Sequence, residues 1–220
     1  MAAATPPAEC GTGDSCQVDG TYPDESMKGL GHRGGAMPRA AHRTGDEVKV
    51  PGISDLKVCV VVGVDDDGRE FAELCDRGHP TDAAVRGSLA GNVGGGCAAG
   101  TDGHGAYKRV LPGLGVTNHL VFPSDGSAGR GLWRVNAAHE RLKAFLVPFN
   151  GVSTRYLPFY LKWWRFDEFV RRAGRDCLAA LQDAMARGRY GIRREGVTTE
   201  QRPFWDYWET RMTQSEVQSA

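Results

Sequence analysis

Short apolar runs alternate with polar, glycine-rich segments through roughly the first 120 residues of the chain. The clearest pattern is a pair of β-rich runs, 57–64 and 69–75, separated by Asp65-Asp66-Asp67-Gly68. Two such runs around an Asp/Gly turn predict a β-hairpin. Similar short runs predict three further strands, at 17–22, 97–101 and 117–122.

Helical patterns follow the hairpin and fill the later part of the chain. Thr81 is a plausible N-cap for a helix that ends near Leu89. Further helices are expected at 105–111, 132–146, 153–172 and about 175–187. The resulting order is strand, hairpin, helix, strand, helix, strand, helices. It predicts an α/β fold with a ribonuclease-H-like, mixed five-stranded sheet, flanking helices and a helical C-terminal extension.

The composition is that of a soluble globular protein and does not indicate a binding partner. The 220 residues are 40% hydrophobic and 25% charged, as in a soluble globular protein with one domain of ordinary size. The 30 glycines are about twice the usual frequency of about 7% and indicate long loops. The net charge of zero neither favours nor excludes nucleic acid, so only local patches bear on that question.

The start of the chain, 1–8, has neither the basic residues nor the apolar stretch of a secretory signal. The longest apolar run, 58–64, is too short to span a bilayer. Three of the six cysteines lie in or beside apolar runs, where cysteine usually behaves as a small buried hydrophobe: Cys59, Cys75 and Cys97. We expect a cytoplasmic protein with reduced thiols and no membrane contact.

Two aspartates, Asp19 and Asp102, lie at the ends of predicted strands. Either one alone, before glycine, is most often a turn former whose side chain bonds its own backbone. Together, at strand ends where open α/β sheets gather functional groups, they suggest a site for Mg²⁺, which prefers a few carboxylates plus water and phosphate. Two such ions can clamp the attacking and leaving oxygens of a phosphodiester.

The helix 132–146 carries an apolar stripe and, beside it, a polar stripe formed by Asn136, Glu140 and Lys143. One interpretation is a solvated face with an ordinary Glu140–Lys143 contact. In the other, Asn136 offers a carbonyl oxygen to a metal and Lys143 holds a DNA phosphate. Glu140 lies one turn from Asn136 and is the alternative third ligand. His139 is expected to contact substrate or to pack locally.

Aromatic residues in the helix 153–172 fall at helical spacings and are expected to be mostly core. Basic residues share this stretch, and they form either a ridge that faces phosphates or a solvated face: Arg155, Lys162, Arg165, Arg171 and Arg172.

Three blocks resemble bacterial insertion-sequence transposases of the DDE class. Val18-Asp19-Gly20-Thr21-Tyr22, with Glu25-Ser26-Met27-Lys28-Gly29, resembles their first catalytic block, and Thr101-Asp102-Gly103-x-x-Ala106-Tyr107 resembles the middle block. The third block, Val-Asn-x-x-His-x-Arg-Leu-Lys, is found at 135–143, followed by similar residues at 149–157. The resemblance covers about 16–170, and the order and spacing of the blocks carry it.

The resemblance implies metal-binding carboxylates at Asp19 and Asp102, with Asn136 in the position often held by Glu. It implies Mg²⁺ (or Mn²⁺) as cofactor and DNA as partner, with a homo-oligomer assembled on the DNA. Lys143 is implied as a DNA contact, and we add His139 and Arg155. We divide the chain into a disordered 1–15, a catalytic domain 16–172 and a helical, irregular tail 173–220.

Such transposases carry a longer N-terminal region with a cysteine-rich ribbon and a helical DNA-binding part, so we expect this chain to be a shortened copy. The predicted function is Mg²⁺-dependent DNA strand cleavage and strand transfer. A second hypothesis is an inactive remnant that only binds DNA. A third is a ribonuclease-H-like nuclease that acts on another nucleic acid.

Overall fold

The structure, a computed structural model, describes residues 10, 15–29, 52–123, 131–187 and 203–210. The strands are β1 (Ser15–Thr21), β2 (Val58–Asp65), β3 (Glu70–Arg77), β4 (Ala98–Thr101) and β5 (Asn118–Val121). The helices are α1 (Asp82–Leu89), α2 (Gly105–Val110), α4 (Trp133–Leu146), α5 (Leu157–Arg172) and α6 (Cys177–Arg187), with single 3₁₀ turns η3 (Leu111–Leu114) and η4 (Val147–Phe149).

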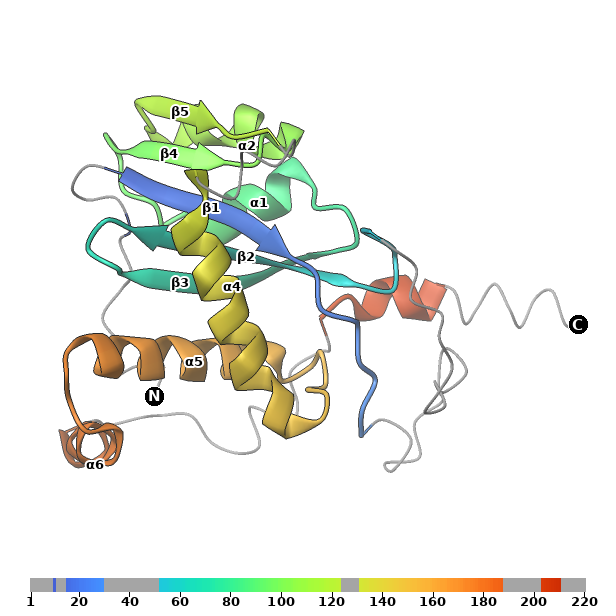
Figure 1. The fold of residues 1–220 in the computed structure, drawn as a ribbon. Coiled ribbons are helices and arrows are strands. Elements are labelled where there is room, and N and C mark those ends of the chain that lie inside the picture. Colours follow the sequence, from blue (N-terminus) through green and yellow to red (C-terminus); the bar gives the residue numbers. More distant parts are fainter. Residues whose placement is uncertain (1–9, 11–14, 30–51, 124–130, 188–202, 211–220) are drawn as a thin grey trace, which may run out of the picture.

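The five strands form one mixed sheet in the order β3-β2-β1-β4-β5 (Figure 1). β1, β2 and β3 pair antiparallel, whereas β4 runs parallel to β1 and β5 runs parallel to β4. The predicted α/β class, with a five-stranded mixed sheet and flanking helices, is therefore confirmed. This architecture is compatible with the ribonuclease-H-like core that the sequence predicts.

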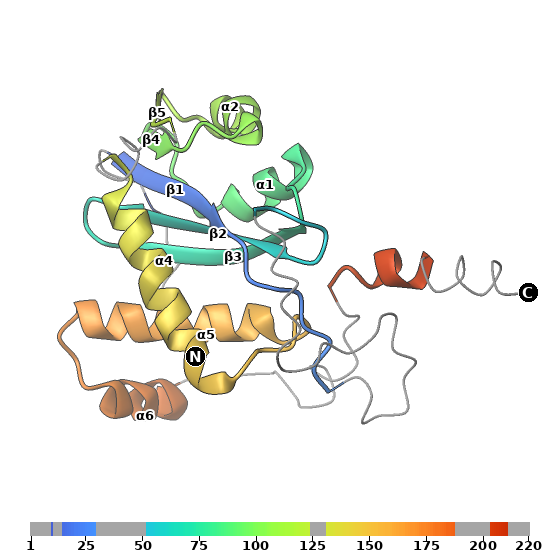
Figure 2. The same ribbon diagram turned by 45° about the vertical axis from the view of Figure 1, so that its right-hand side comes forward.

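Helices cover both faces of the sheet (Figures 1 and 2). Alternate side chains of β1 and β2, such as Val18 and Val61, join the core beneath α1 and α2. The intervening side chains of β2, such as Val60 and Val62, pack with α4 and α5 around Trp164. Side chains of a strand point alternately to its two faces, so this division tells which β1 residues face α4.

The β2–β3 turn forms as its sequence predicts. The Asp65 side chain accepts the backbone N–H of Arg69 at 2.7 Å, and Gly68 has φ of +73°. A positive φ is readily adopted by glycine. Thr81 caps α1 by accepting the N–H of Ala84 at 3.3 Å, also as predicted.

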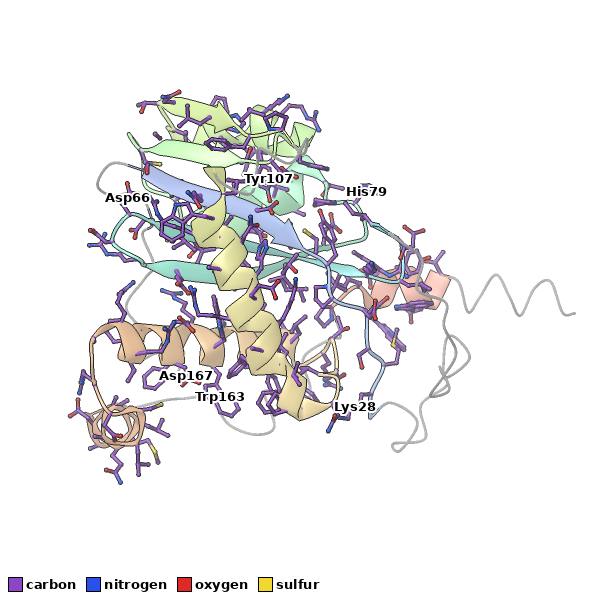
Figure 3. All side chains as sticks on the ribbon, viewed as in Figure 1. Lys28, Asp66, His79, Tyr107, Trp163 and Asp167 are labelled. Atoms are coloured by element: carbon purple, nitrogen blue, oxygen red, sulfur yellow. The ribbon has the colours of Figure 1, made fainter. Side chains whose placement is uncertain are left out.

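Helix α5 begins at Leu157, four residues later than predicted. Pro158 lies in its first turn, where a missing N–H breaks no helical bond, so the proline marks a helix start. The residues before it instead join the segment after β1, because Ser26 and Thr154 exchange backbone and side-chain hydrogen bonds. Lys28 adds bonds of 3.1 Å to the carbonyls of Phe149 and Gly151, beside the end of α4 (Figure 3).

Parts of the predicted terminal segments belong to the folded unit. Cys10, inside the predicted disordered 1–15, is buried, forms a bridge with Val93 and donates its thiol to the carbonyl of Arg69 at 3.1 Å. Cys10 is thus part of the core beneath α1. At the other end, residues 205–210 are helical and Trp208 is buried.

The cysteines lie mainly in the core, and all six are free thiols. Cys59 and Cys97 are buried, as predicted, while Cys75 is half-buried. Among the helices in the described ranges, none has the length and apolar character needed to cross a membrane. Residues 124–130, between β5 and α4, lie outside the described part of the chain.

Candidate active site

Asp19 and Asp102 meet through the register of two parallel strands. Gln17 in β1 lies opposite Gly100 in β4. Continuing this register by two residues brings Asp19, inside β1, opposite Asp102, the first residue after β4. Adjacent strands lie about 4.8 Å apart, so residues in this relation are neighbours. The sequence prediction that these two carboxylates come together therefore agrees with the strand pairing.

The electrostatics of Asp19 report the same proximity. Burial, followed by the negative charge of Asp102, raises the pKa of Asp19 from 3.8 to about 7. A hydrogen bond from the Gly20 N–H opposes this rise. Two like charges in a poorly hydrated place disfavour ionisation of one of them. A bound cation would relieve this repulsion.

Each aspartate also makes the local bond expected of a turn former. Asp19 Oδ1 accepts the N–H of Gly20 at 2.7 Å, and Asp102 Oδ1 accepts the N–H of His104 at 2.9 Å. The Oδ2 atoms of both residues make no hydrogen bond within the described part of the chain. Local turn bonding therefore holds one oxygen of each carboxylate in place and leaves the other for a ligand.

Helix α4 crosses the sheet over β1 (Figures 1 and 2). Its buried residues include Val135, His139 and Leu142. Arg141 reaches toward β3, where it pairs with Glu70. At 3.6 residues per turn, Asn136 lies about 140° around the helix from Arg141. Asn136 is therefore on the opposite flank of α4 from Arg141.

Asn136 is exposed on this flank. Glu140 lies about 40° further from the buried stripe than Asn136. It forms an ion pair of 2.7 Å with Lys143, and both side chains are largely exposed. The ordinary Glu140–Lys143 contact of the solvated-face interpretation therefore exists. The Glu140 carboxylate is thus already paired, and both Asn136 and Glu140 are exposed on this side of α4.

His139 is buried, and burial lowers its pKa to about 4, although a hydrogen bond with the backbone of Asp19 opposes this. The imidazole is neutral at neutral pH, so it is not a cation for a DNA phosphate. The expectation that His139 contacts DNA is not supported by this position, and the alternative of local packing is. Its contact with Asp19 makes it part of the support for the site.

The basic residues around α5 do not form one open ridge. Arg171 pairs with Glu168, and Arg172 donates to the carbonyl of Gly68. Arg165 is half-buried, near the carboxylate of Glu73. Arg165 is thus partly removed from solvent, whereas Lys162, Arg171 and Arg172 are exposed.

Arg155, a predicted DNA contact, is half-buried, with its guanidinium 5.8 Å from the ring centre of Tyr156. Lys143, by contrast, has an exposed side chain on the same helix as Asn136. Of the three predicted DNA contacts, Lys143 is therefore the one whose side chain is largely exposed to solvent.

Two residues near the aspartates were missed from the sequence. Gln17 lies on the same face of β1 as Asp19, and the period-two alternation of a strand could have indicated this face. Its side chain binds the start of α4. Tyr107, on α2, is buried beneath the sheet (Figure 3). Burial and then the charge of Asp19 raise its pKa well above the usual value, so it is a neutral phenol.

The residues present suit a hard divalent cation. Within the described ranges no three His, Cys, Asp or Glu side chains cluster as a metal site. Mg²⁺ does not require such a cluster, because it is commonly bound by one or two carboxylates with water and substrate phosphate as further ligands. The donor set of Asp19, Asp102 and the Asn136 carbonyl would suit that chemistry.

No family model and no curated protein matches the chain. Among solved structures, the chain is similar to one in "CryoEM structure of simian T-cell lymphotropic virus intasome in complex with PP2A regulatory subunit B56 gamma". The identity is 14% and the TM-score 0.44, with 72% of this chain and 51% of that chain covered. The match thus spans about half of that chain, and the function proposed below does not depend on it.

Proposed function

We propose that the protein is a divalent-metal-dependent polynucleotidyl transferase that cuts and joins DNA strands, as a transposase of the DDE class does. The observation that carries this proposal is the parallel register of β1 and β4, which, continued by two residues, sets Asp19 opposite Asp102. The charge effect of Asp102 on Asp19 supports it.

The chain's residues would divide the work as follows. Asp19 and Asp102 bind Mg²⁺ or Mn²⁺, and the Asn136 carbonyl oxygen is the third ligand from the protein. Such ions, when bound, lower the pKa of a water and neutralise charge on the attacking and leaving oxygens. Lys143, on the same helix, binds a phosphate of the DNA and orients the strand. Because its ion pair with Glu140 is exposed, a phosphate can compete for it at little cost.

The test compares wild-type protein with Asp102→Ala and, as control, Asp67→Asn, which changes an exposed aspartate in the β2–β3 turn. The assays are Mn²⁺-dependent nicking of supercoiled plasmid and strand transfer from a duplex with a free 3′-hydroxyl. Wild type and Asp67→Asn should be active, and Asp102→Ala should lose at least about 100-fold. Equal activity in Asp102→Ala would end the proposal.

A second candidate is a DNA-binding remnant without catalysis. It is favoured by the amide at Asn136, where a third carboxylate would hold a metal more strongly, and by the lack of a three-residue acidic cluster in the described residues. A remnant would bind duplex DNA with a strong salt dependence. It would neither cleave DNA nor bind Mn²⁺ specifically.

The third hypothesis, a nuclease for another nucleic acid, differs from the transposase proposal in its preferred substrate. The same assay with an RNA–DNA hybrid and single-stranded RNA at equal salt distinguishes it. Faster cleavage of either than of duplex DNA would replace the transposase proposal with the nuclease.

A further inference from the structure

We infer that Gln17 is a positioning residue, which fixes the start of α4 on β1 and thereby sets Asn136 against Asp19 and Asp102. This inference rests on the proposed function. Gln17 itself would contact neither metal nor DNA.

Gln17 makes three hydrogen bonds with the beginning of α4. Its Oε1 accepts the backbone N–H of Arg134 at 2.9 Å and of Val135 at 3.3 Å. Its Nε2 donates to the carbonyl of Gly131 at 2.9 Å. The first N–H groups of a helix have no partner within the helix. Gln17 thus caps α4 from a strand more than 100 residues earlier.

The helix supplies no cap of its own. Its N-cap residue, Leu132, makes no side-chain hydrogen bond. Gln17 is buried, at 8% exposed, so water replaces its bonds poorly. The position of the helix start therefore depends on this one side chain.

A second contact fixes α4 further along. His139 is buried against the backbone of Asp19, two residues beyond Gln17 on β1. The strand therefore contacts the helix at two points, one at its start and one at its middle.

Asn136 lies between these two points, just after the Gln17 contact. Any slide or rotation of the helix start would move the Asn136 carbonyl relative to the aspartates. A misplacement of about 1 Å at a catalytic centre can reduce the rate by about 100-fold. Loss of Gln17 should therefore weaken metal binding and catalysis although Asp19, Asp102 and Asn136 remain.

The experiment uses the full chain with Gln17→Leu, which keeps an apolar stem and removes all three bonds. Gln17→Glu keeps the two acceptor bonds to Arg134 and Val135 and loses the donor bond to Gly131. The control is Thr81→Ala, which removes the N-cap of α1, away from the aspartates. For each protein we would measure Mn²⁺ binding by electron paramagnetic resonance titration, plasmid nicking at several Mn²⁺ concentrations, and Tm.

We expect Gln17→Leu to raise the Mn²⁺ Kd and the half-saturating Mn²⁺ concentration about 10-fold or more. Gln17→Glu should recover most of this loss, and Thr81→Ala should lower Tm without changing either value. If Gln17→Leu fails to fold, binding by Gln17→Glu within 3-fold of wild type still supports the inference, and a loss greater than 10-fold overturns it.

Two further outcomes distinguish failure of the positioning role from failure of the proposed function. A Mn²⁺ Kd in Gln17→Leu equal to that of Thr81→Ala and wild type would overturn the positioning role while the proposed function stands. Wild-type protein that neither binds Mn²⁺ nor nicks DNA would overturn the proposed function and this inference with it.

Discussion

Trp208 donates its indole N–H to Glu25 Oε1 at 2.7 Å, which joins two residues 183 positions apart. Glu25 Oε2 accepts from Arg77 at 2.8 Å, and the Arg77 guanidinium lies 3.6 Å from the ring centre of Tyr207. Glu25 and Trp208 are both buried. The segment 203–210 therefore completes the region where the chain leaves β1, a few residues after Asp19.

We predict that Trp208→Ala destabilises the protein by about 3–5 kcal/mol, because a large buried side chain is lost and Glu25 loses a hydrogen bond. Trp133→Ala, at an exposed tryptophan, is the control and should change stability by about 0.5 kcal/mol or less. Urea denaturation monitored by circular dichroism measures both. Equal stability of the two variants would show that residues 203–210 do not pack on Glu25 in solution.

We predict that Asp19→Asn stabilises the metal-free protein, because it removes a buried carboxylate that Asp102 repels. The pKa of Asp19 is about 7 in the folded protein, against 3.8 ordinarily. Between these pH values the folded state holds a proton that the unfolded state lacks, so the contribution of Asp19 to stability falls as pH rises. Above pH 7 the gain from Asp19→Asn should reach at most about 4 kcal/mol.

The measurement is urea denaturation in EDTA at pH 4 and pH 8. The difference between Asp19→Asn and wild type should be small at pH 4 and large at pH 8. The control is Asp24→Asn, at an exposed aspartate. A gain that is the same at both pH values would contradict the raised pKa of Asp19.

Arg141 joins three elements by pairing with Glu70 of β3 and, at 3.1 Å, with Glu168 of α5. Arg141→Ala leaves the largely buried Glu70 without its partner, and we expect a loss of about 3–5 kcal/mol. Lys143→Ala, which breaks only the exposed pair with Glu140, should cost less than about 1 kcal/mol. Thermal or urea denaturation at pH 7 compares the two, and similar losses would argue against a structural role for Arg141.

Gly63 lies opposite Phe71 in the hairpin, and a Cβ there would fall 2.1 Å from the ring. Gly63→Ala should therefore destabilise the sheet by about 1–3 kcal/mol. Gly87→Ala, in α1 with open space around it, should instead stabilise by about 0.5–1 kcal/mol. Opposite signs in urea denaturation are the expected result, and a Phe71→Leu background should reduce the loss at Gly63.

Features that depend on adjacent residues could be predicted from the sequence. The hairpin turn at Asp65 and the Thr81 cap are local, and the structure has both. The helical period of the α4 sequence predicted that Asn136 lies beside the apolar stripe, and this pattern also depends only on nearby residues. The meeting of Asp19 and Asp102 required the strand order as well, and the sequence of elements was sufficient for that.

Features that depend on contacts between distant segments could not be predicted. Nothing near Gln17 indicates that it caps a helix more than 100 residues later. The burial of Trp208 depends on Glu25 and Arg77, which the fold alone brings together. His139 lies at the border of the apolar stripe of α4, so whether it faced solvent or core was decided by the position of β1.

The register of β1 has a further consequence for sequence variation. This strand pairs with β2 on one side and β4 on the other, with alternate residues committed to opposite faces. Deleting or inserting one residue before Asp19 would turn its carboxylate toward the core beneath α1 and α2, where Cys16, Cys59 and Cys97 lie. Gly20 or Val18 would then take its place on the face that α4 covers. Length changes in this strand should therefore be far less tolerated than point substitutions.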